Sequence, residues 1–183
     1  MKVTTRRAFI SGTSKTGFGL MLAATALPEI THAFDNKPNK KIGVALMGLG
    51  GFATDTIAPE IAFSKNVWLA GVITGDPQGK GKAWAKQYGF PEKNIYHYNE
   101  IEQIRNNPDI DFVHIVTPNG LHAAHTIAVA KAGKHVLCEK PMAITSAECK
   151  EMIEACKKAG VLLGVNYRLH WEPHHLKMME LTK

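Results

Sequence analysis

A glycine-rich run directly follows a short apolar run and opens a helical pattern. Its six residues are Gly48-Leu49-Gly50-Gly51-Phe52-Ala53. In such a turn the first glycine permits a tight bend, the second lets the backbone approach a pyrophosphate, and the small last position lets the helix pack closely. Amide groups at the start of the helix attract phosphate. The run indicates a dinucleotide site, with a plain strand-to-helix turn or an adenosylmethionine site as the alternatives.

The end of the next apolar run bears on which dinucleotide is bound. It reads Val72-Ile73-Thr74-Gly75, at the point where an acidic residue would hold the ribose diol of NAD. Asp76 comes two residues late and is explained equally well as a helix cap. Thr74 offers a hydroxyl, and Lys80 and Lys82 can neutralise a 2′-phosphate, although a solvated helix face explains both lysines nearly as well. The pattern favours NADP over NAD.

Three further polar clusters each follow an apolar run. They are Thr117-Pro118-Asn119 with His122 in the next turn, Glu139-Lys140-Pro141, and Asn166-Tyr167-Arg168. Ligands bind outside the carboxyl ends of the strands in open parallel sheets. We therefore expect these clusters to meet at one edge of a sheet.

Alternating β-branched and amphipathic segments supply the elements that would position these groups. Near-continuous apolar runs predict buried strands at 42–47, 67–74, 112–117, 135–138 and 161–165, with a short extended piece at 95–96. Helical patterns occupy 51–64, 78–88, 101–106, 121–132 and 146–159. The alternation predicts an α/β fold of the Rossmann type, with a doubly wound, mostly parallel sheet.

Local signals mark the ends of these helices. Asp76 can cap the second helix, and Thr145 can cap the last one with Glu148 in its first turn. Pro59 should kink or divide the first helix. Glycines that can take the left-handed conformation follow three helices, at Gly89, Gly133 and Gly160.

Composition excludes several other classes of protein. The chain has 183 residues, 45% of them hydrophobic, and a formal charge of +6. Residues 1–33 carry a surplus of three positive charges, which leaves a surplus of three for the rest, so no basic face for nucleic acid is expected. No apolar run reaches the length of about 18 residues that a membrane-spanning helix needs.

The cysteines and the C-terminal histidines do not form a metal motif. The cysteines lack the spacing of a zinc or redox pair, and packing is their expected role. Three histidines near the end of the chain have no ordered ligand spacing, so no metal is expected. These six residues are Cys138, Cys149, Cys156, His170, His174 and His175.

The first 33 residues have the three parts of an export signal. A basic start with Arg6 and Arg7 precedes an apolar stretch at 17–27 and a small-residue end at Ala33. The arginine pair followed by Phe9 resembles a bacterial twin-arginine leader. We therefore expect export to the periplasm in the folded state, with a disordered basic tail as the alternative.

Together the motifs resemble the glucose-fructose oxidoreductase (Gfo/Idh/MocA) family over about residues 40–175. The matching features are the glycine turn, the Thr-Pro-Asn cluster with its nearby histidine, the Ala-Gly-Lys-His-Val-x-Cys-Glu-Lys-Pro run and the Asn-Tyr-Arg run. Lys80 also matches, although one residue is inserted between Gly75 and Lys80. The resemblance implies hydride transfer between a nicotinamide and a sugar or polyol hydroxyl.

The resemblance also implies roles for single residues. Lys140 would contact the substrate hydroxyl and the nicotinamide ribose, and Pro141 would fix its turn, through a cis peptide where one forms. The positive charge of oxidised nicotinamide favours the neutral amine, which can then exchange a proton. The other residues implied at the cofactor are Glu139, Asn119, His122, Tyr167 and Arg168, each with a purely structural alternative.

The family pattern continues into a second, α+β domain that supplies the substrate pocket. We expect residues 34–165 to form the dinucleotide-binding domain and residues 166–183 to begin a truncated C-terminal domain. A full-length protein is expected to be a homo-oligomer. A non-catalytic dinucleotide-binding or regulatory module is the alternative function.

Overall fold

The computed structural model describes residues 41–182. The predicted export signal, residues 1–33, lies outside the described residues. The described chain begins directly before the first predicted strand.

Six parallel strands form one sheet, in the order β3-β2-β1-β4-β5-β6. This order confirms the predicted doubly wound sheet, in which the strand order reverses beside the first strand. The first and third strands have the predicted bounds, and the other boundaries differ by one or two residues. The strands are β1 (Ile42–Met47), β2 (Val67–Ile73), β3 (Ile95–Tyr96), β4 (Phe112–Ile115), β5 (His135–Glu139) and β6 (Leu163–Asn166).

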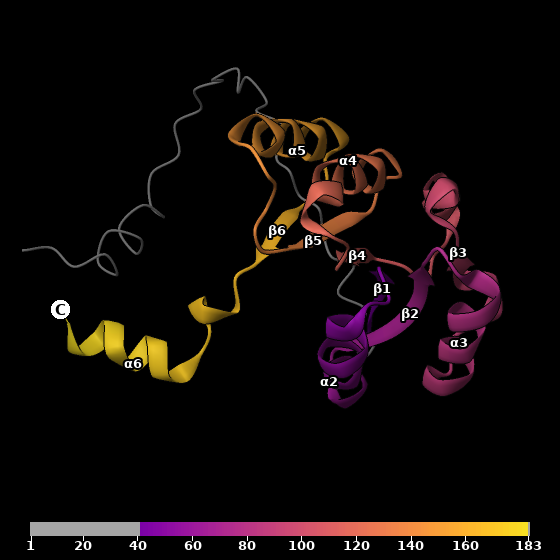
Figure 1. The fold of residues 1–183 in the computed structure, drawn as a ribbon, viewed down its shortest axis with the longest axis horizontal. Coiled ribbons are helices and arrows are strands. Elements are labelled where there is room, and N and C mark those ends of the chain that lie inside the picture. The colour runs from indigo at the N-terminus through magenta and orange to yellow at the C-terminus, as the bar shows by residue number, and fades with distance from the viewer. Residues whose placement is uncertain (1–40, 183) are drawn as a thin grey trace, which may run out of the picture. The chain divides into compact units, whose positions relative to one another are not determined.

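Helices and helical turns connect the strands (Figure 1). The α-helices are α2 (Ala58–Phe63), α3 (Lys82–Tyr88), α4 (His122–Lys131), α5 (Ser146–Ala159) and α6 (Pro173–Leu181). Wide π turns precede the first two, at Ala53–Ile57 and Pro77–Gly81. Tight 3-10 turns occupy Glu92–Asn94, Tyr98–Asn106, Asn119–Leu121 and Arg168–His170.

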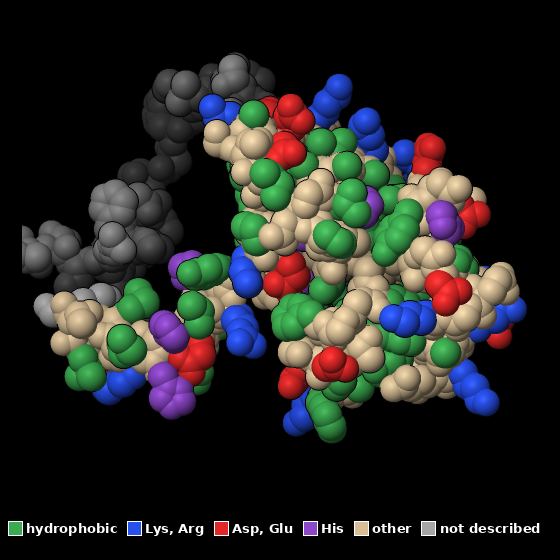
Figure 2. All heavy atoms as spheres, in the orientation of Figure 1, with side chains coloured by type: hydrophobic (Ala, Val, Ile, Leu, Met, Phe, Trp, Pro, Cys, Tyr) green, Lys and Arg blue, Asp and Glu red, His purple; other side chains and the backbone are tan. Residues whose placement is uncertain are grey.

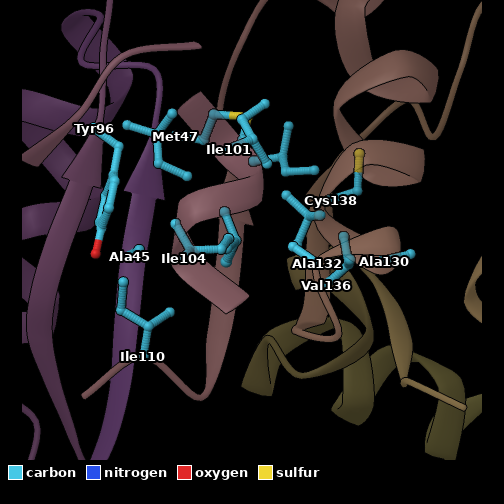
Figure 3. Packing of buried hydrophobic residues seen from close by; sticks show 14 of the residues in the cluster. Ala45, Met47, Tyr96, Ile101, Ile104, Ile110, Ala130, Ala132, Val136 and Cys138 are labelled. Carbon is cyan, nitrogen blue, oxygen red and sulfur yellow. The ribbon is translucent and has the colours of Figure 1, made fainter. Parts of the chain in front are cut away.

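Side chains alternate between two buried clusters, one on each face of the sheet. On β1, Ala45 and Met47 join the cluster covered by α4, α5 and the 3-10 turn Tyr98–Asn106, whereas Val44 and Leu46 join the cluster covered by α2 and α3. Figure 3 shows the first cluster, with Met47, Ile101 and Ile104 packed between the sheet and that turn. Burial on both faces explains why the strands are apolar at nearly every position.

The first two helices each contain a π turn that the sequence patterns did not predict. Predicted helix 51–64 is divided into the π turn Ala53–Ile57 and α2, and Pro59 lies in the first turn of α2. Because proline has no N–H to donate, the ladder of hydrogen bonds changes spacing near it, as expected. The π turn Pro77–Gly81 closes with a hydrogen bond from the Gly81 amide to the Asp76 carbonyl, at 2.9 Å.

The predicted capping residue Thr145 and the glycines that follow three helices are confirmed. Thr145 Oγ1 accepts from the Glu148 amide at 3.2 Å, and Glu148 Oε2 accepts from the Thr145 amide at 2.9 Å, which completes a capping box. Three glycines have φ of 77°, 73° and 67°, in the left-handed region that favours glycine: Gly89, Gly133 and Gly160.

The cysteines are at least partly buried, whereas the last helix exposes hydrophobic side chains. Cys138 and Cys156 are buried in the core and Cys149 is half-buried, as packing residues would be, and burial raises the pKa of the Cys138 thiol to about 11. On α6, hydrophobic side chains are exposed (Figure 2): Leu176, Met178, Met179 and Leu181. No helix within residues 41–182 has the length and apolarity to cross a membrane.

Candidate functional site

The glycine turn is held between the ends of β1, β2 and β4. Gly48 has φ of 94°, and its amide donates to the Ile73 carbonyl at 3.0 Å. A Cβ at this position would lie 2.9 Å from Thr117 Cγ2 and 3.0 Å from the Val116 backbone. Both the backbone conformation and the space therefore require glycine here.

The second glycine faces open space instead of protein. A Cβ on Gly50 would meet no atom within 4 Å. The Gly50 carbonyl accepts from both the amide and the hydroxyl of Thr54, at 3.0 and 2.9 Å, and Ala53 is fully buried against the sheet. The first amides of a helix have no intrahelical acceptor, so this turn offers N–H groups beside empty volume. Such an arrangement suits an anionic phosphate.

The end of β2 supplies a neutral hydroxyl and a lysine. Asp76, predicted to cap the next helix, accepts from the amides of Gly79 and Lys80 at 2.9 and 3.0 Å. These hydrogen bonds, from Lys80 first and Gly79 second, lower the pKa of Asp76. Thr74 Oγ1 accepts from the Asp76 amide at 3.2 Å and is nearly buried. Asp76, the acid two residues after Thr74, is thus already engaged as a cap.

Lys80 reaches back to the glycine turn. Its Nζ donates to the Leu49 carbonyl at 3.0 Å, across a separation of 31 residues. The π turn Pro77–Gly81, which takes one more residue than an α turn, carries Lys80 at the start of this helical segment. The Lys80 amine thereby lies at the groove along the glycine turn.

Glu139 and Lys140 lie at the end of β5 in different surroundings. Glu139 is 7% exposed, whereas the Lys140 side chain is exposed, and the Lys140–Pro141 peptide bond is cis. Glu139 Oε1 lies 3.0 Å from His114 Nε2 and accepts from Asn166 Nδ2 at 2.5 Å.

Glu139 is held as a carboxylate by its donors. Burial opposes its ionisation, but hydrogen bonds from His114 and Asn166 outweigh burial and lower the pKa of Glu139. Because this pKa is lower in the folded chain than the ordinary 4.5, ionised Glu139 stabilises the fold above that value. The stabilisation is lost as the pH falls through the folded-state pKa.

His122 joins two turns of the site from the start of α4. It is 1% exposed, and its ring nitrogens lie 2.8 Å from the carbonyls of Thr117 and Pro141. One nitrogen donates in the neutral ring, and both donate in the imidazolium form. This histidine therefore ties the turn that carries Lys140 to the end of β4.

Tyr98 and His125 brace Thr117 from the other side. The two rings are stacked, with centroids 5.4 Å apart and planes 8° apart, and His125 Nδ1 lies 3.0 Å from Thr117 Oγ1. Burial first, and the charge of His122 second, lower the pKa of His125, and burial raises the pKa of Tyr98. Both rings are therefore neutral near pH 7.

All sixteen predicted site residues line one of two adjoining cavities. The first, of about 610 Å³, runs along the glycine turn and is lined by Gly48, Leu49, Gly50, Gly51, Phe52, Thr74, Gly75, Lys80, Thr117 and Pro118. The second, of about 470 Å³, is lined by Phe52, Thr117, Asn119, His122, Glu139, Lys140, Tyr167 and Arg168. Phe52 and Thr117 belong to both, so the cavities form one continuous surface for an elongated ligand.

Other residues also line the cavities. Tyr98 lines the first, and Asn166 and Leu169 line the second. Asn166 belongs to the strand-end cluster expected from the sequence, whereas Tyr98 was not predicted, because it lies in a 3-10 turn with no local signal. Within residues 41–182, no group of three or more His, Cys, Asp or Glu side chains is arranged to hold a metal ion.

The strand order, the glycine turn and the two cavities define a dinucleotide-binding Rossmann domain. A family model described as "oxidoreductase family, NAD-binding Rossmann fold" matches residues 42–167, and the chain belongs to this Gfo/Idh/MocA family. The family match confirms the predicted fold and the predicted class of cofactor.

Two of the similar named proteins are a 1,5-anhydro-D-fructose reductase and a scyllo-inositol dehydrogenase. The chain is 39% identical to 1,5-anhydro-D-fructose reductase of Ensifer adhaerens over 101 residues, which are 55% of this chain and 29% of the relative. It is 41% identical to scyllo-inositol 2-dehydrogenase (NADP(+)) of Bacillus subtilis over 92 residues, 50% and 25% of the two chains.

A solved structure of an oxidoreductase is similar to this chain over a longer stretch than these two relatives. The crystal structure of aldose-aldose oxidoreductase from Caulobacter crescentus is similar with a TM-score of 0.75 and 45% identity, covering 78% of this chain and 42% of that one. The chain thus spans less than half the length of each of these relatives.

Replacing Gly50 with valine tests the groove. Because a Cβ at Gly50 meets no protein atom, the fold should keep its free energy of unfolding, while the added methyl groups occupy the space needed by the phosphates. We expect NADP affinity to fall at least about tenfold in calorimetric titration, a loss of roughly 1.4 kcal/mol. Gly120→Val, also in open space, is the control. An unchanged NADP affinity in Gly50→Val would show that the phosphates do not bind beside Gly50.

Proposed function

We propose that this chain is the cofactor-binding part of an NADP-dependent oxidoreductase that transfers hydride between nicotinamide and a sugar or polyol hydroxyl. The observation that carries the proposal is the continuity of the two cavities: a phosphate-type glycine groove leads directly to Lys140 and Glu139. Family membership and the sugar and polyol relatives support it.

The residues present fit a dinucleotide. The space beside Gly50 is open where the phosphates would lie, and Thr74 and Lys80 would meet the adenosine ribose. Asn119, Tyr167 and Arg168 line the second cavity, where they would surround the nicotinamide end.

Within the second cavity, Lys140 and Glu139 have complementary tasks. Bound nicotinamide supplies the site for hydride. Lys140 carries an exposed amine on a flexible stem, which would take the proton of the substrate hydroxyl at Nζ during oxidation and return it during reduction. Glu139, held as a carboxylate, accepts hydrogen bonds from ligand hydroxyls. His122 keeps the turn of Lys140 in place by its contact with the Pro141 carbonyl.

Three features favour NADP over NAD. The carboxylate of Asp76 is engaged by two amides, Thr74 takes the usual place of the acid, and the Lys80 amine reaches the groove. The amine can leave the Leu49 carbonyl for a 2′-phosphate, because an ammonium is attracted more strongly to a charged phosphate oxygen than to a neutral carbonyl oxygen. The scyllo-inositol relative is named as using NADP(+).

Further proposals concern the complete protein. Residues 1–33 would direct export of the folded protein to the periplasm with its cofactor bound, residues 34–165 would be the cofactor domain, and residues 166–183 would begin the substrate domain. The exposed hydrophobic side chains of α6 are suited to packing within that domain or within a homo-oligomer.

Lys140→Met should abolish turnover and spare cofactor binding. Loss of a general acid–base group costs about 10²- to 10⁴-fold in rate. Sugar-dependent reduction of NADP, measured on the longest natural form of the protein, should fall by that factor while NADP affinity changes less than about threefold. Lys150→Met, on the exposed side of α5, should match the wild type. A wild-type protein that binds NADP but turns over no sugar or polyol would favour a regulatory module.

Lys80→Met should reduce the preference for NADP. We expect affinity for NADP to fall about tenfold, since one charge-assisted hydrogen bond contributes roughly 1.5–3 kcal/mol. Affinity for NAD, which lacks the 2′-phosphate, should stay within about twofold. Lys82→Met is the matched control, because Lys82 points to Glu92, 3.8 Å away. Equal losses for both nucleotides would assign Lys80 to the phosphate turn instead.

Replacing Arg6 and Arg7 together with lysines tests the export proposal. The charge of the leader is kept, but the arginine pair that defines a twin-arginine leader is lost. The wild-type protein should be recovered from the periplasm, and the double variant should remain in the cytoplasm when cell fractions are probed by immunoblotting. Periplasmic recovery of both proteins would argue against this route.

A further inference from the structure

His114 is a buried polar residue on an otherwise apolar strand. It is 5% exposed and lies in β4 between Val113 and Ile115, which are both fully buried. A buried imidazole is costly unless it is hydrogen-bonded. Its hydrogen-bond partner is Glu139, whose Oε1 lies 3.0 Å from His114 Nε2. The sequence pattern predicted only that His114 lies within a strand and indicated no contact for its side chain.

Strand register brings this pair together. His114 pairs with Leu137 on β5, and Glu139 is two residues further along the same strand. Residues two apart on a strand face the same side, so the two side chains meet diagonally. Asn166 lies on β6 and pairs with Glu139 of β5 in the sheet. Its Nδ2 donates to the same oxygen of Glu139, Oε1.

The donors around Glu139 leave acceptor positions for a ligand. His114 and Asn166 both engage Oε1. A carboxylate has about four lone-pair sites, so these two contacts do not fill it. Glu139 also lines the cavity of about 470 Å³.

Titratable and polar groups face this carboxylate from several elements. His114 comes from β4 and Asn166 from β6, while Lys140, His122 and Arg168 share the cavity wall with it. The pKa of Glu139 is lowered although burial raises it, so the carboxylate depends on its donors to remain ionised. Removing a donor while keeping the burial should allow the carboxylate to protonate at higher pH.

We propose that His114 is a positioning residue, which acts through Glu139 by orienting its carboxylate to accept a hydrogen bond from a ribose hydroxyl at the nicotinamide end of the cofactor. This inference rests on the proposed function. His114 itself is separated from the ligand by Glu139, so its effect should appear only with ligands that reach the second cavity.

Comparing two ligands distinguishes a local effect on Glu139 from a general loss of folded structure. NADP extends through both cavities, whereas 2′,5′-ADP lacks the nicotinamide ribose and should occupy only the glycine groove. His114→Phe should weaken NADP about tenfold at pH 7 and leave 2′,5′-ADP within about twofold in calorimetric titration. His114→Gln, which can donate from its amide, should recover most of the NADP affinity. His174→Phe, on an exposed side chain of α6, is the control.

The pH profile provides a second readout. NADP affinity of the wild type should stay level as the pH falls from 7 to about 5, and in His114→Phe the decline should begin at higher pH because the pKa of Glu139 rises. Equal affinities and equal pH profiles in wild type and His114→Phe would overturn the inference. Wild-type protein that binds neither ligand would instead overturn the proposed function.

A measurement on the unaltered protein covers the case in which His114→Phe does not fold. In nitrogen-15 NMR spectra, the Nε2 proton of His114 should be protected from exchange, and its signal should shift on addition of NADP but not of 2′,5′-ADP. A signal that responds equally to both ligands, or an Nε2 without a proton, would contradict the positioning role.

Discussion

Parallel pairing of the strands is the constraint on which the site depends. Met47 at the end of β1 pairs with Ile73 on β2 and with Ile115 on β4, and Cys138 on β5 pairs with Val165 on β6. Since all strands run in the same direction, the residues that follow them meet at one edge. Groups that are distant in sequence thus become neighbours, while the apolar strand interiors fix the register that holds them there.

Features with local causes could be predicted from the sequence. The helix Ser146–Ala159 has the predicted bounds because its capping residues, Thr145 and Glu148, lie within three positions of each other. The strand Ile42–Met47 was also predicted correctly, since burial on both faces leaves a continuous apolar run. The turn after it could be predicted because Gly48 requires a positive φ and Gly50 an open approach.

The contacts that set the chemistry could not be predicted in the same way. The bond from Lys80 to the Leu49 carbonyl spans 31 residues, and the contact between His114 and Glu139 spans 25. Both depend on strand register and on turn geometry, which no local pattern encodes. A histidine within an apolar strand is also ambiguous, because the same residue is satisfied by any nearby acceptor. The strand ends therefore indicated where a site would form, but not which side chains would pair within it.

The π turns show how ligand-facing residues and core residues are kept separate in this fold. The turn Pro77–Gly81 takes one more residue than an α turn, and Trp84 and Ala85 on the following α3 are buried. An α-helical insertion would rotate every later side chain by about 100°, since there are 3.6 residues per turn, and would expose this face. In a π turn the wider spacing is limited to the residues of that turn, so the side chains that follow keep their orientation. The residues that line the first cavity, such as Asp76 and Lys80, can therefore change without repacking the core that orders the strand ends.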